Sequence, residues 1–274
     1  MHAASRCDRV LTGAPASPPT FPGYTWPIHT EACYSLRWSV QEVYPQVSTS
    51  TTSWNPHVRI RTETVQGDGI VVVMDIPAAD YVTAGEGQVT DLPAMRLGAM
   101  SVHAVLTPQG YWKDVRWSVP TNPTLPPSVL TAMLPLSDLL PLVPVDGWTA
   151  DRPMDVHVPA STLAIGGLHI QPRTPQNFAV HIAPSVRDGH WTVRSTLTLP
   201  SELPIFVKGP STPGQPQGLY PGTITAHRVT QDDLKGRDGG MLIRAEGTWQ
   251  GTISTANPRQ SNFIARWELT PIGS

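Results

Sequence analysis

Three histidines at equal spacing in the middle of the chain are the residues whose pattern most suggests chemistry. His157, His169 and His181 are 12 residues apart, and each lies between two apolar residues. Three imidazoles on one face of adjacent strands could bind zinc, because neighbouring strands lie only about 4.8 Å apart. A zinc-bound histidine normally donates its second ring nitrogen to a carboxylate or carbonyl, and the nearby carboxylates are only Asp155 and Asp188. We therefore interpret the histidines as outward-facing residues of successive strands and predict neither a metal site nor a cofactor.

Acidic residues gather in the segment QDDLKGRDGG (231–240), which contains Asp232, Asp233 and Asp238. These carboxylates could bind calcium, but they lack the alternating spacing of a calcium-binding loop. We therefore interpret the segment as a solvated turn between two strands. The chain also lacks the GxSxG, HExxH, Walker and GxGxxG motifs. No pair of carboxylates stands in a context that requires acid–base catalysis, so we predict a protein that is not an enzyme and name no catalytic residue.

The tryptophans are further side chains that could contact a ligand, because indoles stack on sugar rings. Most of them fall within segments in which apolar and polar residues alternate, so we predict that they pack in a core or pair across a sheet. The tryptophans concerned are Trp38, Trp112, Trp117, Trp191, Trp249 and Trp267.

Alternation of apolar and polar residues predicts the elements that position these side chains. In YSLRWSVQEV (34–43), the apolar residues from Tyr34 to Val40 share one face, as in a half-buried strand. Similar alternation occurs in HVRIRTETV, AMSVHAVLT, WTVRSTLTL, TITAHRV, MLIRAEGTW and NFIARWEL. Tight turns with glycine and aspartate, such as QGDGI (66–70) and RDGHW (187–191), join several segments as hairpins. The sequence therefore predicts an all-β, mainly antiparallel fold: a large curved sheet, half-barrel or sandwich with one or two short helical segments.

The distribution of proline divides the chain into a tether and one domain. Residues 1–31 are rich in proline and small residues, which favours a flexible, extended tether. Residues 32–274 then form a single β-rich domain with two strand-rich halves, 32–119 and 153–272. A segment rich in proline and leucine, 120–150, joins the two halves.

The joining segment contains the one stretch that looks helical, PPSVLTAMLPLSDLL (126–140). Its prolines prevent one long helix, and its apolar residues are too many to lie exposed to water. We therefore predict that the segment covers the concave face of the sheet, as a movable lid over a ligand cavity or as a permanent plug. The candidate ligand-binding residues of this apolar lid are Val129, Leu130, Met133, Leu134, Leu139 and Leu140.

Charge and hydropathy limit the partners that the chain can bind. A net charge of −2 at pH 7 gives no basic surface for nucleic acid or for an anionic membrane. No apolar run reaches the roughly 18 residues that a transmembrane helix needs. The expected partners are therefore a lipid, another apolar small molecule, or other proteins of an envelope or assembly.

The N-terminal residues bear on the location of the protein. Residues 1–27 lack the apolar core of a signal peptide, yet a cysteine followed by a tether of small residues and proline is typical of an exported lipoprotein. Arg6, directly before Cys7, is atypical of a lipidation site. Cys7 could be lipidated, pair with Cys33 or stay free. We expect a location in the cell envelope, in the periplasm or outside the cell.

Several motifs follow one another in a recognisable order. They are a first strand beginning CYSLRWSV, the hairpin RTETVQGDGIVVVMDI, the strand LTPQGYWKDVRW and the segment LPLVPVDGWTADRPM, with long strands after them. This order resembles that of secreted bacterial proteins of the lipoprotein-carrier-like (LolA/LppX-like) type, over residues 33–272. The resemblance implies a strongly curved antiparallel sheet around an apolar cavity that short helical segments close. It transfers no functional residue.

The predicted fold and the resemblance together favour a non-enzymatic protein of the bacterial envelope or exterior. Such a protein would bind a lipid or another apolar ligand on the concave face of its sheet. The alternative is a structural or assembly protein, such as a capsid, surface-layer or envelope-complex component, whose sheet faces contact other chains. A hydrolase is the third interpretation.

Overall fold

The computed structural model confirms the all-β fold that the alternating sequence predicts. Its described residues form a 16-stranded antiparallel sheet, a separate two-stranded sheet and one short helix. Among these residues, no helix has the length and hydropathy needed to span a bilayer. The structure describes residues 18–44, 48–87, 92–118, 136–159, 170–174, 176–208, 219–237, 239–255 and 260–272.

The elements follow in chain order. The first half of the chain contains β1 (Thr20–Phe21), β2 (Glu31–Tyr44), β3 (Ser48–Trp54), β4 (His57–Gln66), β5 (Gly69–Ile76), β6 (Ala79–Gly87), β7 (Leu92–Leu97), β8 (Met100–Leu106) and β9 (Trp112–Ser118). The second half contains α2 (Leu136–Leu139), β10 (Trp148–Thr149), β11 (Met154–Pro159), β12 (Ile170–Pro172), β13 (Asn177–Arg187), β14 (His190–Thr198), β15 (Leu203–Lys208), β16 (Leu219–Lys235), β17 (Met241–Thr255) and β18 (Gln260–Pro271).

Two long strands divide the large sheet into branches. β2 pairs with β4 through its first residues, Glu31 to Ser35, and with β3 through its last, Trp38 to Tyr44. β16 pairs in the same way with both β15 and β14. The main path runs β11–β13–β14–β16–β17–β18–β2–β4–β5–β8–β9. Its two end strands do not pair with each other, so the described sheet is not closed into a barrel.

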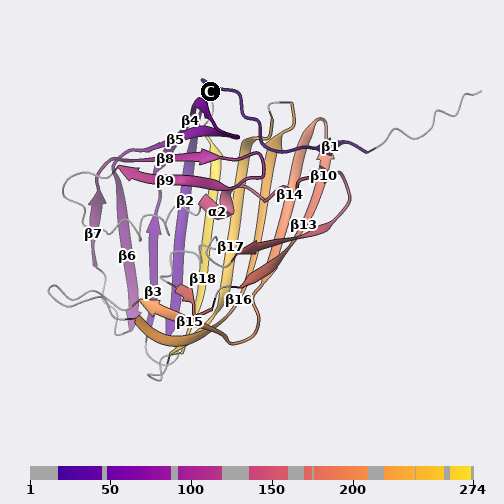
Figure 1. The fold of residues 1–274 in the computed structure, drawn as a ribbon. Coiled ribbons are helices and arrows are strands. Elements are labelled where there is room, and N and C mark those ends of the chain that lie inside the picture. The colour runs from indigo at the N-terminus through magenta and orange to yellow at the C-terminus, as the bar shows by residue number, and fades with distance from the viewer. Residues whose placement is uncertain are drawn as a thin grey trace, which may run out of the picture.

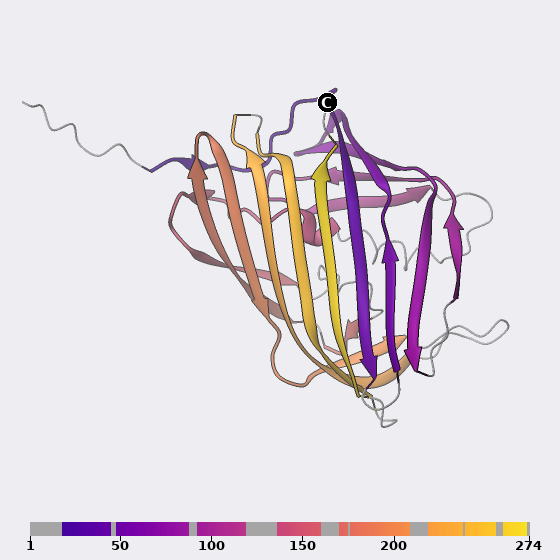
Figure 2. The ribbon, with the colours of Figure 1, turned by 180° about the vertical axis from the view of Figure 1, so that it is seen from behind.

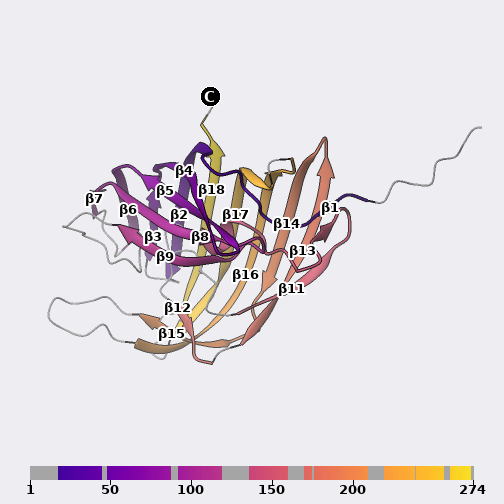
Figure 3. The same ribbon diagram turned by 45° about the horizontal axis from the view of Figure 1, so that its top comes forward.

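The long strands form a curved wall, and one branch crosses in front of it. Figure 1 shows β2, β18, β17, β16, β14 and β13 as the wall, with β4, β5, β8 and β9 crossing near its top. Figure 2 shows the wall from behind, and Figure 3 shows β8 and β9 in front of it with the top turned forward. Buried side chains of both layers form one hydrophobic core, so the concave side of the wall faces the interior.

Alternation along each strand decides which side chains enter this core. In β18, Phe263 and Trp267 are buried, whereas Arg266 between them is exposed. The hairpin predicted from RDGHW joins β13 to β14, and its Asp188 and Gly189 have positive φ angles of 51° and 77°. Two successive positive φ angles match the right-handed twist of the flanking strands. Local sequence therefore determines both the faces and the connections of these strands.

The prediction of a flexible N-terminal tether is wrong for residues 18–31, the part of it that the structure describes. Phe21, Tyr24 and Trp26 are each at most 3% exposed and belong to the core. β1 pairs with β10, and the Tyr24 hydroxyl donates a hydrogen bond of 2.8 Å to the backbone oxygen of Pro141. Three aromatic rings bury enough apolar surface to hold a proline-rich segment against the domain. Residues 1–17 lie outside the described residues.

The described part of the predicted lid begins with α2, directly after Pro135 in the sequence. Leu139 and Leu140 are buried, as an apolar covering segment requires. α2 packs against β17 on the concave side of the wall. The other candidate residues of the lid, Val129, Leu130, Met133 and Leu134, lie outside the described residues.

Candidate functional site

The predicted histidine face lies only partly within the described residues. His157 on β11 and His181 on β13 are exposed and point away from the core, as the alternation predicts. His181 is opposite Asp155, and its Nδ1 lies 2.9 Å from the Asp155 Oδ1. His169 lies outside the described residues, and within them no group of three or more His, Cys, Asp or Glu is placed to hold a metal ion. The pair of His181 and Asp155 is an exposed surface contact.

Polar side chains gather instead on the concave face, among apolar residues of the core. We name Asp138, Ser195, Arg228, Thr230 and Asp232 the inner polar cluster. They are five of the eight polar or charged residues that are buried in the described part of the chain. They come from α2, β14 and β16. Burying polar groups is costly unless they are hydrogen-bonded, so the partners of each one decide what the cluster can do.

Asp138 joins α2 to the sheet through two side chains. Its Oδ1 accepts a hydrogen bond from Arg228 Nη1, and its Oδ2 accepts one of 3.0 Å from Trp249 Nε1. The Arg228 guanidinium also lies over the Trp249 ring, 5.6 Å from the ring centroid. Arg228 and Trp249 are opposite each other on β16 and β17, so the register of the sheet brings both under α2. Burial raises the pKa of Asp138, and the charge of Arg228 and the two hydrogen bonds offset only part of this rise.

Asp232 is the charged member of the cluster that has no hydrogen-bond partner among the described residues. Its side chain is completely buried, and neither carboxylate oxygen has a hydrogen-bond donor among the described residues. Burial raises the pKa of Asp232 well above its ordinary value; Arg228 opposes the rise, and Asp138 and Asp233 add to it. A weak hydrogen-bonding contribution from the Thr230 hydroxyl also opposes the rise, although neither Asp232 oxygen has a described donor within full hydrogen-bond distance and angle. The Asp232 carboxyl therefore holds a proton more readily than an exposed aspartate does.

A row of side chains across the sheet, next to Asp232, contains further buried polar atoms without hydrogen-bond partners in the described part of the chain. Ser195 is opposite Thr230, and Thr230 is opposite Gly247. The Trp267 indole occupies the space above Gly247, because a Cβ there would lie 2.5 Å from Trp267 Nε1. The Ser195 hydroxyl, Arg228 Nε and Trp267 Nε1 are all buried and lack a hydrogen-bond partner in the described structure. Buried polar groups are normally bonded, so these atoms indicate a place for a ligand or for water.

Four aromatic rings, which we name the aromatic cluster, pack near Asp232. Phe21 stacks on Trp148 with centroids 4.8 Å apart, and it contacts Tyr24 and Trp191 edge to face at 5.4 and 5.7 Å. After burial, the charge of Asp232 is the second cause that raises the pKa of Tyr24, so the phenol and the carboxyl are close enough to interact. Asp232 therefore lies near aromatic rings as well as near the ion pair of Asp138 with its arginine.

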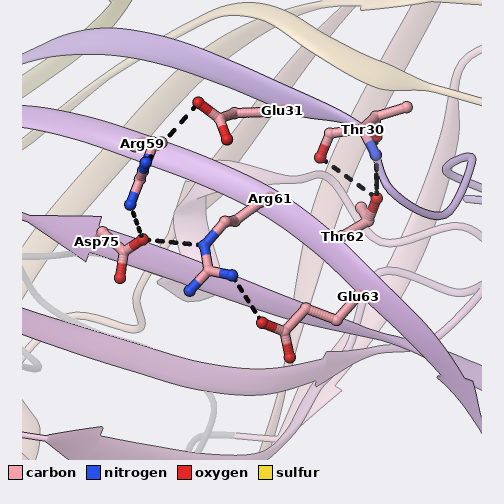
Figure 4. Close-up of polar contacts among 7 residues, drawn as sticks. All are labelled: Thr30, Glu31, Arg59, Arg61, Thr62, Glu63 and Asp75. Atoms are coloured by element: carbon pink, nitrogen blue, oxygen red, sulfur yellow. Dashed lines mark hydrogen bonds and ion pairs between the residues drawn. The ribbon is translucent and has the colours of Figure 1, made fainter.

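A second group of charged residues, the outer charge network, lies on the outer face of the front layer. Asp75 of β5 lies between two arginines of β4 (Figure 4), and its Oδ2 accepts hydrogen bonds of 2.9 Å from Arg59 Nη2 and 3.0 Å from Arg61 Nε. Arg59 also approaches Glu31, and Arg61 donates a hydrogen bond of 2.8 Å to Glu63. Partial desolvation would raise the pKa of Asp75, but the hydrogen bonds and charges of Arg61 and Arg59 lower it overall. Each charge in this network is partly exposed and has a partner of opposite sign.

Two grooves also open on outer faces of the sheet. One, of about 750 Å³, is lined in part by Cys33, Arg59 and Asp75. The other, of about 500 Å³, is lined in part by Arg37 and Glu268, and its lining also includes Thr230, Gly247 and Trp267. In each groove the arginine pairs with the carboxylate, at 2.9 Å in the first and 4.0 Å in the second. Exposed ion pairs of this kind are ordinary surface features. The inner polar cluster is the stronger candidate site because its buried atoms lack partners.

Sequence reasoning missed this site. We predicted that Asp232 lies in a solvated turn, and this is wrong, because β16 continues to Lys235 and buries Asp232 on its inner face. A signal was present in the sequence. Asp232 precedes the apolar Leu234 by two residues, and residues two apart face the same side of a strand. Asp138 gave no comparable signal, because its burial depends on Arg228, 90 residues further along the chain.

The other residues singled out in the sequence have ordinary surroundings. Asp233 faces outward, where the Thr192 hydroxyl donates a hydrogen bond of 2.7 Å to its Oδ1. Asp238 lies outside the described residues. The predicted packing of tryptophans is confirmed for four of them, which are buried in the core: Trp38, Trp191, Trp249 and Trp267. Trp112 and Trp117 are partly buried and pack against the same core.

The chain has distant structural similarity to proteins of known structure. No family model and no curated protein sequence matches it. Among solved structures, the chain is similar to DynF from the dynemicin biosynthesis pathway of Micromonospora chersina, at 12% identity over 98% of this chain and 92% of that one, with a TM-score of 0.25. A TM-score this low carries no argument about function. The resemblance to the lipoprotein-carrier-like type stays a prediction.

Proposed function

We propose that the protein binds a small amphiphilic molecule on the concave face of its sheet, beneath α2. The observation that carries this proposal is the inner polar cluster, with buried donors and acceptors that lack partners inside an apolar core. A ligand with an apolar body and one polar end matches both parts of this environment, because ligand sites combine apolar walls with a few convergent polar groups. The proposal requires no catalytic residue, in line with the sequence-based expectation of a binding protein.

α2 is the element that would move to admit the ligand. It is held by the side chains of Leu136, Asp138 and Leu139, and it is not part of a strand ladder. Side-chain contacts can open locally while the sheet persists, as they do in segments that cover ligand sites. This arrangement favours the movable lid over the permanent plug.

Binding of a fluorescent anilinonaphthalene probe tests the proposal. Leu139→Ser and Leu140→Ser loosen α2, and Val145→Ser is the matched control, because Val145 lies in the same segment and is 89% exposed. We expect the unmodified protein to bind the probe and decanol to displace it. The two leucine variants should bind more probe and exchange it faster with the β-sheet circular dichroism retained, whereas the control should behave like the unmodified protein.

Two results would overturn the proposal. The first is that the unmodified protein binds neither the probe nor decanol. The second is that both leucine variants lose their β-sheet signal without a state that binds the probe, because a polar residue in a permanent plug costs roughly 2–5 kcal/mol per site.

In native mass spectrometry, a symmetric oligomer without ligand would support the structural or assembly role instead. The expected location in a bacterial envelope or outside the cell stays a prediction, and the binding proposal does not depend on it.

A further inference from the structure

The inner polar cluster contains one more carboxyl group than cations. Among the described residues, the buried charged side chains are Asp138, Arg228 and Asp232. Asp138 and Arg228 form an ion pair and neutralise each other. Asp232 is left with two buried oxygens that accept no hydrogen bond from any described residue. An ionised carboxylate in this position is strongly unfavourable unless another positive charge joins it.

The surroundings of Asp232 suit a cation supplied by a ligand. Trp191 of the aromatic cluster is opposite Leu234, the next inward-facing residue after Asp232 on β16, and the charge of Asp232 contributes to the raised pKa of Tyr24. Aromatic faces attract organic cations through their negative π-electron density. Ser195 lies across from Thr230 on the neighbouring strand, and its unpartnered hydroxyl can accept a hydrogen bond from an ammonium group. A carboxylate, a hydroxyl and nearby aromatic rings together form a suitable environment for a protonated amine.

We propose that Asp232 is the counter-ion for the protonated amine of an amphiphilic ligand whose apolar chain packs against the concave face. This inference rests on the proposed binding function and names the chemical class of the ligand. A ligand carboxylate would bring a negative charge that no cation of the cluster is free to neutralise. A ligand alcohol would leave Asp232 protonated and form only a neutral hydrogen bond with it. An amine forms a stronger, charge-assisted hydrogen bond with the ionised carboxylate.

A proton competes with the amine for Asp232. Burial raises the pKa of Asp232, so without ligand the carboxyl stays protonated at a higher pH than an exposed aspartate does. Binding of the ammonium requires the ionised carboxylate and releases this proton, so the affinity for an amine rises with pH toward the raised pKa. The titratable and charged groups whose charges interact with Asp232 are Arg228, Asp138 of α2, Tyr24 and the outward-facing Asp233.

Three probes with the same apolar chain and different polar ends test the inference: decylamine, decanol and decanoate. Each is titrated calorimetrically into the full chain below its micelle-forming concentration. We expect decylamine to bind at least about tenfold more tightly than decanol, which corresponds to about 1.4 kcal/mol, and decanoate to bind most weakly. Asp232→Asn should remove the preference for decylamine and leave decanol binding unchanged. Asp233→Asn is the matched control, because it changes the next residue on the same strand, which faces outward, and it should keep the preference.

The outcomes separate this inference from the function on which it rests. If decanol or decanoate binds as tightly as decylamine, the amine assignment is wrong and the binding function stands. If none of the three binds, both are wrong. A preference for decylamine that survives Asp232→Asn would also overturn the inference, because another group would then be the counter-ion. Should Asp232→Asn fail to fold, the unmodified protein decides: an affinity for decylamine that does not rise with pH overturns the inference.

Discussion

Two carboxyl groups on opposite faces of the same sheet have opposite environments. Asp75 of the outer charge network is partly exposed and is bonded to two arginines, whereas Asp232 is fully buried and is bonded to no described residue. The surroundings lower the pKa of Asp75 and raise that of Asp232. A modest contribution of exposed ion pairs to stability is sufficient to explain the arrangement around Asp75. Stability does not explain the burial of Asp232, because an apolar residue would fill the same place at a lower cost in free energy. The buried, unsatisfied group is thus the better marker of function.

The largest effect is expected where the inner polar cluster forms its ion pair. Asp138→Ala removes the carboxylate that is hydrogen-bonded to the buried Arg228, and with it the acceptor of Trp249 Nε1. We expect the free energy of unfolding to fall by about 3–5 kcal/mol, measured by urea denaturation. Asp138→Asn keeps an acceptor for Trp249 and should lose less. A loss below about 1 kcal/mol for the alanine variant would mean that this contact does not anchor α2.

A smaller loss is expected from Gly247→Ala on the concave face. The new Cβ would lie 2.5–2.7 Å from three atoms of the Trp267 indole, so the ring must move. We expect a loss of about 1–3 kcal/mol and a change in tryptophan fluorescence. Thr248→Ala, on the outer face of the same strand, should stay within about 0.5 kcal/mol of the unmodified protein. Equal stabilities of the two variants would show that the indole does not rest on the glycine.

A pH-dependent gain in the free energy of unfolding is expected from Asp232→Asn. The folded protein raises the pKa of Asp232, so between the ordinary aspartate range and the raised value the folded state binds more protons than the unfolded state. Stability therefore falls as pH rises through this window, and the amide removes that loss. We expect the variant to be more stable at neutral pH by at least about 1 kcal/mol, and the difference to shrink in acid. Urea unfolding at several pH values measures this, and a difference that does not change with pH would contradict it.

The smallest effect is expected from Asp75→Asn in the outer charge network. Its contribution is present at neutral pH and is lost as pH falls, because the arginines lower its pKa in the folded state. An exposed network of this kind contributes about 1 kcal/mol or less and is screened by salt. We expect a loss in this range that shrinks further in high salt. A loss as large as that of Asp138→Ala would remove the contrast between the two faces.

The fold could be predicted from the sequence because its signals are local. Alternation of residue types assigns the faces of strands such as β18, and the turn at Asp188 and Gly189 fixes an antiparallel pair. The N-terminal segment was mispredicted because proline content outweighed its aromatic residues. Phe21 and Tyr24 become part of the core through contacts that include residues more than a hundred positions away, such as Trp148 and Pro141.

The candidate site could be predicted only in part. The alternation of residues along β16 places Asp232 on the inner face. The acidic residues around it led instead to the prediction of a solvated turn. The pairing of Asp138 with Arg228 was beyond local reasoning, since it depends on where α2 crosses the sheet. The spacing of His157 and His181 was the clearest pattern in the sequence, yet it marks two outward positions on neighbouring strands.

The open ends of the sheet bear on how the protein behaves at high concentration. β9 ends the path of the sheet and pairs only with β8 among the described strands, so one of its edges is unpaired. An unpaired edge invites strands of other molecules to add to it and to start aggregation. In β9, Lys113, Asp114 and Arg116 are exposed, and the positive φ of Asp114 (50°) interrupts the regular strand. Charge and an irregular backbone therefore discourage the edge-to-edge polymerisation that an open sheet would otherwise permit.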